Sequence, residues 1–108
     1  MNEKKLLKYA IDYLSKYDSS KKNLLYILKR KIFRLNLTGI EKKRLIDKLE
    51  NILFELEKNK FIDDKRYTQS KISLLSRSGK SKNYIFNYLI LKGIDKFEIN
   101  NNFNIYNR

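Results

Sequence analysis

Apolar residues recur every three or four positions along the chain, which is the spacing of amphipathic α-helices. In the first half this pattern predicts a helix over residues 4–17 and a second helix that begins at a serine cap and reaches about residue 35. A third helix is predicted over residues 41–59, where Thr38 and Glu41 match a capping box. Its apolar face is wide enough to contact two neighbouring helices.

The second half contains signals for three more helices. Asp63 precedes an apolar-periodic run and is predicted to cap a helix that Gly79 ends. Ser81 is predicted to cap the next helix, which stops at Gly93. Asp95 then opens a last helix, whose apolar pattern is lost in the polar run "NNNFNIYNR". Because no segment alternates like a strand and no Pro interrupts the helices, the predicted fold class is all-α.

The adjacent acids Asp63 and Asp64 admit two interpretations. They are a candidate acid/base or metal-binding pair, and they are also residue types that favour the start of a helix. A metal site would require a His or a third carboxylate nearby, and none lies near the pair in sequence. We therefore interpret them as capping residues, and a nuclease or other metal enzyme built on them is the least favoured alternative.

The composition limits the possible chemistry. The chain has no His and no Cys, so it lacks the commonest general base, the commonest zinc ligands and a thiol nucleophile. We expect no enzymatic activity, no catalytic residue, no metal and no cofactor. No stretch approaches the roughly 18 apolar residues that a membrane span needs. We expect a cytoplasmic protein that does not enter a membrane.

The net charge of +13 results from 25 basic and 12 acidic residues. Coding bias toward Lys, Asn and Ile explains part of the excess, but the acids are absent from residues 19–40 and 65–94. Such clustering predicts a polyanionic partner, although a basic helix face is often only solvated. The candidate contact residues are Lys21, Lys22, Lys29, Arg30 and Arg34 in the second helix and Arg77, Lys80, Lys82 and Lys92 around the fifth.

The tyrosines divide into two groups by helical position. Tyr17, Tyr67 and Tyr88 lie on apolar stripes and are predicted to be core residues. Tyr26 and Tyr84 lie off the main stripes, amid basic residues, and are the better candidates for stacking against unpaired bases.

The chain also contains an internal repeat at an offset of 61 residues. The third helices match only after about seven residues around "FRLNLTG" are looped out. Residues 1–60 are predicted to form a first three-helix repeat and residues 61–108 a second, truncated repeat within one continuous helical unit. The matched pairs include Ser20 with Ser81, Leu24 with Ile85, Leu28 with Leu89 and Lys31 with Lys92.

Two strings of the second repeat, "FIDDKRYTQSKI" and "GKSKNYIFNYLILKGI", resemble the RecX family of bacterial recombinase regulators. A weaker likeness lies in "AIDYLSKYDSSKKNLLYILKRK", so the resemblance extends from about Ala10 to Ile99. It implies a curved array of tandem three-helix repeats, without catalytic activity. It further implies binding to the RecA filament on single-stranded DNA and regulation, most simply inhibition, of its activity in recombination and DNA repair.

The sequence departs from the family pattern at two places. The first repeat has Lys31-Ile32 where the family usually has Lys-Gly, so its second helix is expected to run on to about Leu35. Family members generally carry a third repeat, and we expect this chain to be a short form that lacks it.

The basic faces are expected to contact phosphates and acidic protein surface, which positions a partner without reading base sequence. We expect the protein to act as a monomer and direct contact with nucleic acid to occur. The main alternative is a general nucleic-acid-binding domain of the helix-turn-helix type, whose recognition helix would carry Asn83 and Asn87.

Overall fold

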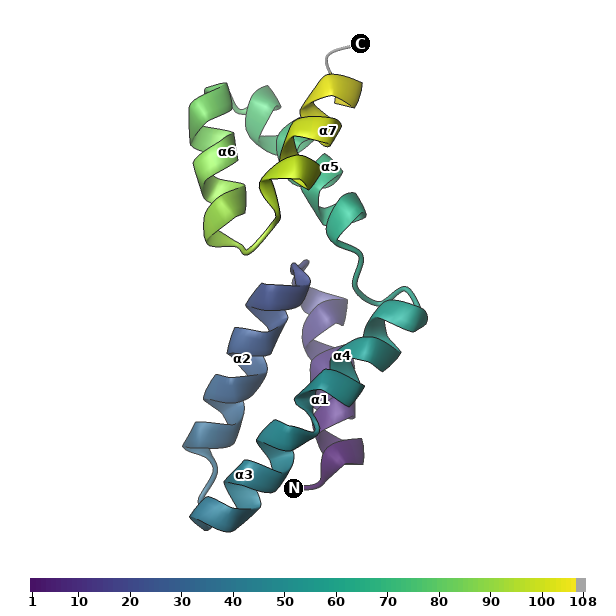
Figure 1. Cartoon of the computed structure of the whole chain (residues 1–108), viewed down its shortest axis with the longest axis vertical. Coiled ribbons are helices and arrows are strands. Elements are labelled where there is room, and N and C mark those ends of the chain that lie inside the picture. The colour runs from purple at the N-terminus through teal and green to yellow at the C-terminus, as the bar shows by residue number, and fades with distance from the viewer. Residues whose placement is uncertain (107–108) are drawn as a thin grey trace. The chain divides into compact units, whose positions relative to one another are not determined.

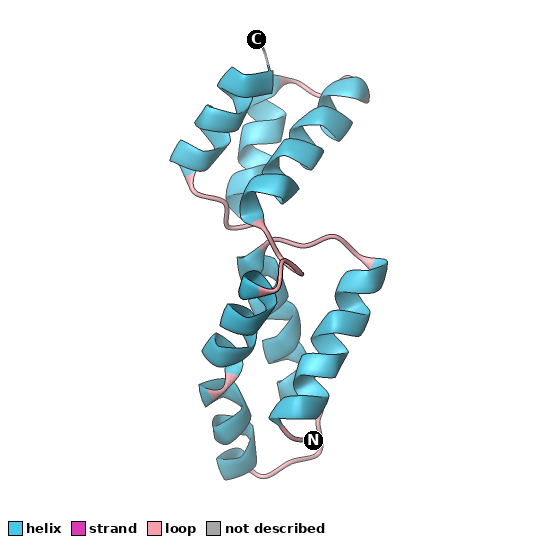
Figure 2. Cartoon of the chain, turned by 90° about the vertical axis from the view of Figure 1, so that its right-hand side faces the viewer, coloured by secondary structure: helices cyan, strands magenta, loops and turns pink. Residues whose placement is uncertain are grey.

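The computed structural model describes residues 1–106 of the chain, and these residues form helices and connecting turns without any strand. The all-α class is therefore confirmed over this range (Figures 1 and 2). The chain divides into two compact units, Met1–Ile62 and Asp63–Arg108. The helices are α1 (Glu3–Lys16), α2 (Lys21–Arg34), α3 (Gly39–Asp47), α4 (Leu49–Lys58), α5 (Asp64–Arg77), α6 (Lys82–Leu91) and α7 (Lys96–Tyr106).

The first unit packs α1, α2, α3 and α4 around one apolar core. The most deeply buried stripe is that of α2, where Leu24, Leu28 and Ile32 are fully buried. Helix α4 contacts both α1 and α2. The wide apolar face predicted for the third helix is thus explained by two neighbours within the same unit (Figure 1).

The predicted third helix is interrupted, because α3 and α4 are separated at Lys48 (Figure 2). The backbone N–H of Lys48 donates to the Leu45 carbonyl three residues back, at 3.1 Å, which tightens the helix locally. The start of α3 agrees with the sequence, since the Thr38 hydroxyl accepts from the Glu41 N–H at 3.1 Å. The expectation of one unbroken helix was wrong.

The second unit packs α5, α6 and α7 around a separate core. The prediction that the last helix loses its pattern was wrong, because α7 continues to Tyr106. Ile99 and Phe103, four residues apart, are buried in the core, and the Asn102 side chain donates to the Glu98 carbonyl at 2.7 Å. The polar run therefore forms a helix because a few of its side chains are buried against the core of the second unit. Asn107 and Arg108 lie outside the described residues.

Local capping bonds begin α2 and α6 as the sequence predicted. The Ser20 hydroxyl accepts a hydrogen bond from the backbone N–H of Asn23, and the Ser81 hydroxyl accepts one from that of Tyr84, both at 3.1 Å. Gly79 and Gly93 have φ values of +87° and +82°, the left-handed conformation that favours Gly after a helix. These termini are fixed by bonds between residues that are close in sequence.

The acidic pair at the start of α5 contains a helix cap. The Asp63 carboxylate accepts from the Arg66 N–H at 3.1 Å, and its backbone is extended, as an N-cap requires. Asp64 is the first residue of the helix, where its negative charge favours the positive end of the helix dipole. The capping interpretation of Asp63 is confirmed.

We predict that Asp63→Ala lowers the free energy of unfolding by about 0.5–2 kcal/mol, since Ala cannot accept the Arg66 N–H. Asp63→Asn is the matched control, because Asn caps helices about as well as Asp and lacks the charge. Circular dichroism during thermal or urea unfolding measures both. Equal stability of the Ala variant and the parent would contradict the capping role.

We also predict that Leu49→Ala and Leu53→Ala each lower the free energy of unfolding by about 2–5 kcal/mol, because both side chains are buried in the first core. Phe54, which lies next to Leu53 but is 62% exposed, provides the control. Phe54→Ala should change stability by only about 0.5 kcal/mol. If the Leu53 and Phe54 variants unfold at the same denaturant concentration, the core has been assigned wrongly.

Candidate nucleic-acid interface

The basic side chains of α2 face away from the first core. Because Leu24, Leu28 and Ile32 hold one side of the helix in the core, the opposite side faces outward. Four of the predicted contact residues are exposed here, namely Lys22, Lys29, Arg30 and Arg34. The fold therefore brings these cations onto one helix.

Two predicted residues of α2 have acidic neighbours. The half-buried Lys21 forms an ion pair with Glu57 of α4, at 3.5 Å between Nζ and Oε1. Lys29 lines a cavity of about 330 Å³ together with Asp47 and Glu50. The charges of Lys21 and Lys29 are therefore partly offset by these carboxylates. Lys22, Arg30 and Arg34 are better placed to bind an anion.

The second set of predicted residues lies in the second unit. Arg77, Lys80 and Lys82 are exposed and close in sequence, from the last turn of α5 to the first residue of α6. Lys92 is half-buried at the other end of α6, with its ammonium 5.6 Å from the ring centre of Tyr88. The first three residues form one group, and Lys92 is separate from it.

The structure corrects one prediction about the tyrosines. Tyr17 is 58% exposed rather than buried, because it follows α1 with an extended backbone and its ring packs beside that of Tyr13, at 5.0 Å between centres. Tyr67 is buried as predicted, and Tyr88 is half-buried.

The two predicted stacking residues are both exposed, Tyr26 at 58% and Tyr84 at 48%. Each has a cation over its ring. The Arg30 guanidinium lies 5.6 Å from the ring centre of Tyr26, and the Lys80 ammonium lies 4.9 Å from that of Tyr84. Ring and charge are thus presented together, as stacking surfaces for single strands require.

A basic pocket between α1 and α2 was not predicted from the sequence. It has a volume of about 240 Å³ and is lined by Tyr9, Tyr13, Ile27, Arg30, Lys31, Arg34 and Leu35. The spacing of Tyr9 and Tyr13, four residues apart on α1, is the sequence signal for it.

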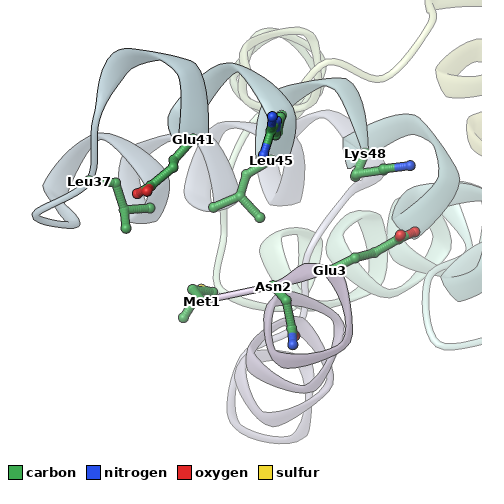
Figure 3. A pocket seen from close by; sticks show the side chains of 8 residues that line it. Met1, Asn2, Glu3, Leu37, Glu41, Leu45 and Lys48 are labelled. Atoms are coloured by element: carbon green, nitrogen blue, oxygen red, sulfur yellow. The ribbon is translucent and has the colours of Figure 1, made fainter.

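A larger cavity of about 570 Å³ lies between the start of α1 and the α3–α4 segment (Figure 3). Figure 3 shows Leu37, Glu41, Leu45 and Lys48 along one side of the cavity and Met1, Asn2 and Glu3 along the other. Arg44 also lines the cavity. Two acidic and two basic side chains therefore balance one another, and this cavity does not favour a polyanion.

The described residues contain no group of three or more His, Cys, Asp or Glu side chains that could hold a metal ion. Over the same range, no helix has the length and apolar character needed to cross a membrane.

Comparison with known proteins gives one similarity. No family model matches the chain, and no solved structure matches it. The chain is 31% identical over 86 residues to a curated protein, "Regulatory protein RecX" of Myxococcus xanthus (strain DK1622). The match covers 79% of this chain and 46% of that protein, so the chain spans about half the length of this relative. The similarity supports the resemblance to RecX that the sequence motifs indicated.

Proposed function

We propose that this protein is a RecX-type regulator that binds the filament of a RecA recombinase on single-stranded DNA and modulates, most simply inhibits, its activity in recombination and repair. The similarity to the Myxococcus xanthus regulatory protein carries the proposal, because it extends over four-fifths of this chain. Exposed basic side chains in both units support it, since a nucleoprotein filament is an extended polyanion.

The repeat organisation is part of the proposal. We infer that the first unit is a complete three-helix repeat and the second a repeat with a shorter third helix. The starts of α5 and α6 follow those of α1 and α2 at the same offset of 61 residues that relates the two halves of the sequence. Burial supports this match at Leu24 and Ile85, and at Leu28 and Leu89, which are buried in their respective cores.

The proposed contacts are electrostatic. The exposed cations of α2 and of the α5–α6 turn neutralise phosphates or acidic protein surface, which fixes the position of the protein without reading bases. In this proposal Lys21 and Lys92 act mainly within the fold, because Lys21 pairs with Glu57 and Lys92 lies over Tyr88. Regulation results from occupancy of the filament and needs no chemical step, in agreement with a sequence that lacks His and Cys.

The competing function is general nucleic-acid binding by a helix-turn-helix type of domain. It depends on Asn83 and Asn87, which are exposed on α6 and could reach base edges. Such a domain would prefer naked duplex DNA. The proposed regulator would prefer the recombinase filament, and its affinity for duplex would be no greater than for a single strand.

We predict that the protein slows the ATPase and strand-exchange activities of the cognate recombinase and binds its filament more tightly than naked DNA. Filament binding should weaken as salt rises, because neutralised phosphates release counterions. Filter binding at several salt concentrations, alongside recombinase ATPase assays, measures both. Preferential binding to naked duplex, with no effect on the recombinase, would instead favour the helix-turn-helix alternative.

We further predict that Lys22→Glu, Lys80→Glu and Lys82→Glu together abolish the effect on the recombinase while the protein stays folded. Lys22 and Lys82 lie in the first turns of α2 and α6, where an acid is favourable to the helix dipole. The matched control replaces three exposed lysines outside both candidate groups, Lys4, Lys43 and Lys65, by Glu.

Both triple variants have the same net charge, so a loss caused by total charge alone would affect them equally. The control variant should retain most of the parental effect. If the two variants inhibit the recombinase equally well, the partner surface lies outside these faces.

A further inference from the structure

The pocket between α1 and α2 combines three cations with two aromatic rings. Tyr9 and Tyr13 are half-buried on the α1 side, and Arg30, Lys31 and Arg34 come from a little more than one turn of α2. No acidic side chain is among its lining residues in the described part of the chain. Its charge is therefore positive, unlike that of the two cavities described above.

The position of these cations has a partial structural explanation. Lys31 and Arg34 lie in the last turn of α2, where positive charge favours the negative end of the helix dipole. Arg30 and Arg34, however, are four residues apart, a spacing at which like charges repel. Neither cation has a carboxylate within ion-pair distance among the described residues. An anion between them would relieve the repulsion, and guanidinium groups match phosphate geometry particularly well.

The rings identify the kind of anion. Lys31 already lies over the Tyr9 ring, 4.9 Å from its centre, which holds that ammonium beside the pocket. The tyrosine series continues out of the pocket, because the Tyr13 ring packs against the exposed ring of Tyr17. A surface of aromatic rings next to phosphate-binding cations is the arrangement that holds unpaired bases.

The size and surroundings of the pocket favour one unit of a polymer. Its volume of about 240 Å³ is below the roughly 300–1,000 Å³ that is usual for small-molecule and cofactor sites. Outside it, Arg30 also contacts the exposed Tyr26, which provides a second ring close to the same cation. A strand that left the pocket would thus meet another aromatic surface.

We propose that the α1–α2 pocket binds one nucleotide of a single-stranded nucleic acid, with its base against the rings of Tyr9 and Tyr13 and its phosphate held by Arg30, Lys31 and Arg34. This inference deepens the proposed function and rests on it for the choice of DNA as the strand. Duplex DNA does not fit, since its bases are already stacked and paired.

The test uses the full chain and a fluorescently labelled oligothymidine, without recombinase, and measures binding by anisotropy. Tyr13→Leu, which keeps apolar bulk but removes the ring, should weaken binding by at least about fivefold, the loss expected for one stacking contact. Tyr13→Phe keeps the ring and should bind like the parent. The parent should bind an otherwise identical strand with abasic sites more weakly than the intact strand. For this abasic strand, the parent and Tyr13→Leu should have the same affinity.

Arg34 is exposed, so its substitution tests the phosphate contact without disturbing the core. Arg34→Gln should lower the dependence of log affinity on log salt by about 0.7, the value for one phosphate contact on a single strand. Lys43→Gln removes the same charge from an exposed position on α3 and should leave this slope nearly unchanged.

Three results would overturn the pocket assignment: no measurable binding of the oligothymidine by the parent, equal affinity for intact and abasic strands, or unchanged binding by both Tyr13→Leu and Arg34→Gln. Failure of the proposed function looks different. In that case the naked strand binds through the pocket as described, but the parent has no effect on a recombinase filament. If Tyr13→Leu and Arg34→Gln both bind the naked strand like the parent and still slow the recombinase, the pocket assignment is refuted and the regulator proposal is kept.

Discussion

Burial of Leu24, Leu28 and Ile32 determines the orientation of α2, and most of the candidate surface depends on that orientation. The three side chains are fully buried in a core that α1 and α4 share with α2, so rotation of α2 would expose them to water. With this side fixed, the basic residues of the helix lie either outward or beside the neighbouring helices, Lys21 next to Glu57 of α4 and Lys31 next to Tyr9 of α1. In the second unit, Ile85 and Leu89 hold α6 in the same way. Apolar packing thus sets the position of charges that contribute little to the core themselves.

The features predicted correctly from the sequence are those determined by neighbouring residues. A cap such as Ser20, Ser81 or Asp63 accepts a hydrogen bond from an N–H three residues away, so its chemistry is contained in a few letters of sequence. The left-handed conformations of Gly79 and Gly93 are equally local. The exposure of most of the basic candidates also followed from the sequence, because it is the complement of a regular apolar stripe.

The features missed depend on packing between segments or on small departures from regular geometry. Tyr17 continues the apolar spacing of α1, but the helix ends one residue earlier and the extended backbone turns its ring to solvent. The separation of α3 from α4 coincides with one tightened hydrogen bond at Lys48. No residue type at this point of the sequence predicts it. The α1–α2 pocket requires knowing which faces of two helices meet. The sequence contained both the tyrosine series and the cations, but not their proximity.

The aromatic side chains explain how so basic a chain keeps its charge available. With 25 basic and 12 acidic residues, carboxylates cannot pair with most of the cations. Several lie over rings instead, and in four of these pairs the cation and the ring are four residues apart, including Arg30 over Tyr26 and Lys80 over Tyr84. A carboxylate would cancel the charge it orders, whereas a ring restrains the side chain and leaves its charge intact. Such restraint lowers the entropy lost on binding a phosphate. Coding bias can supply both residue types, but it does not explain their repeated placement four residues apart.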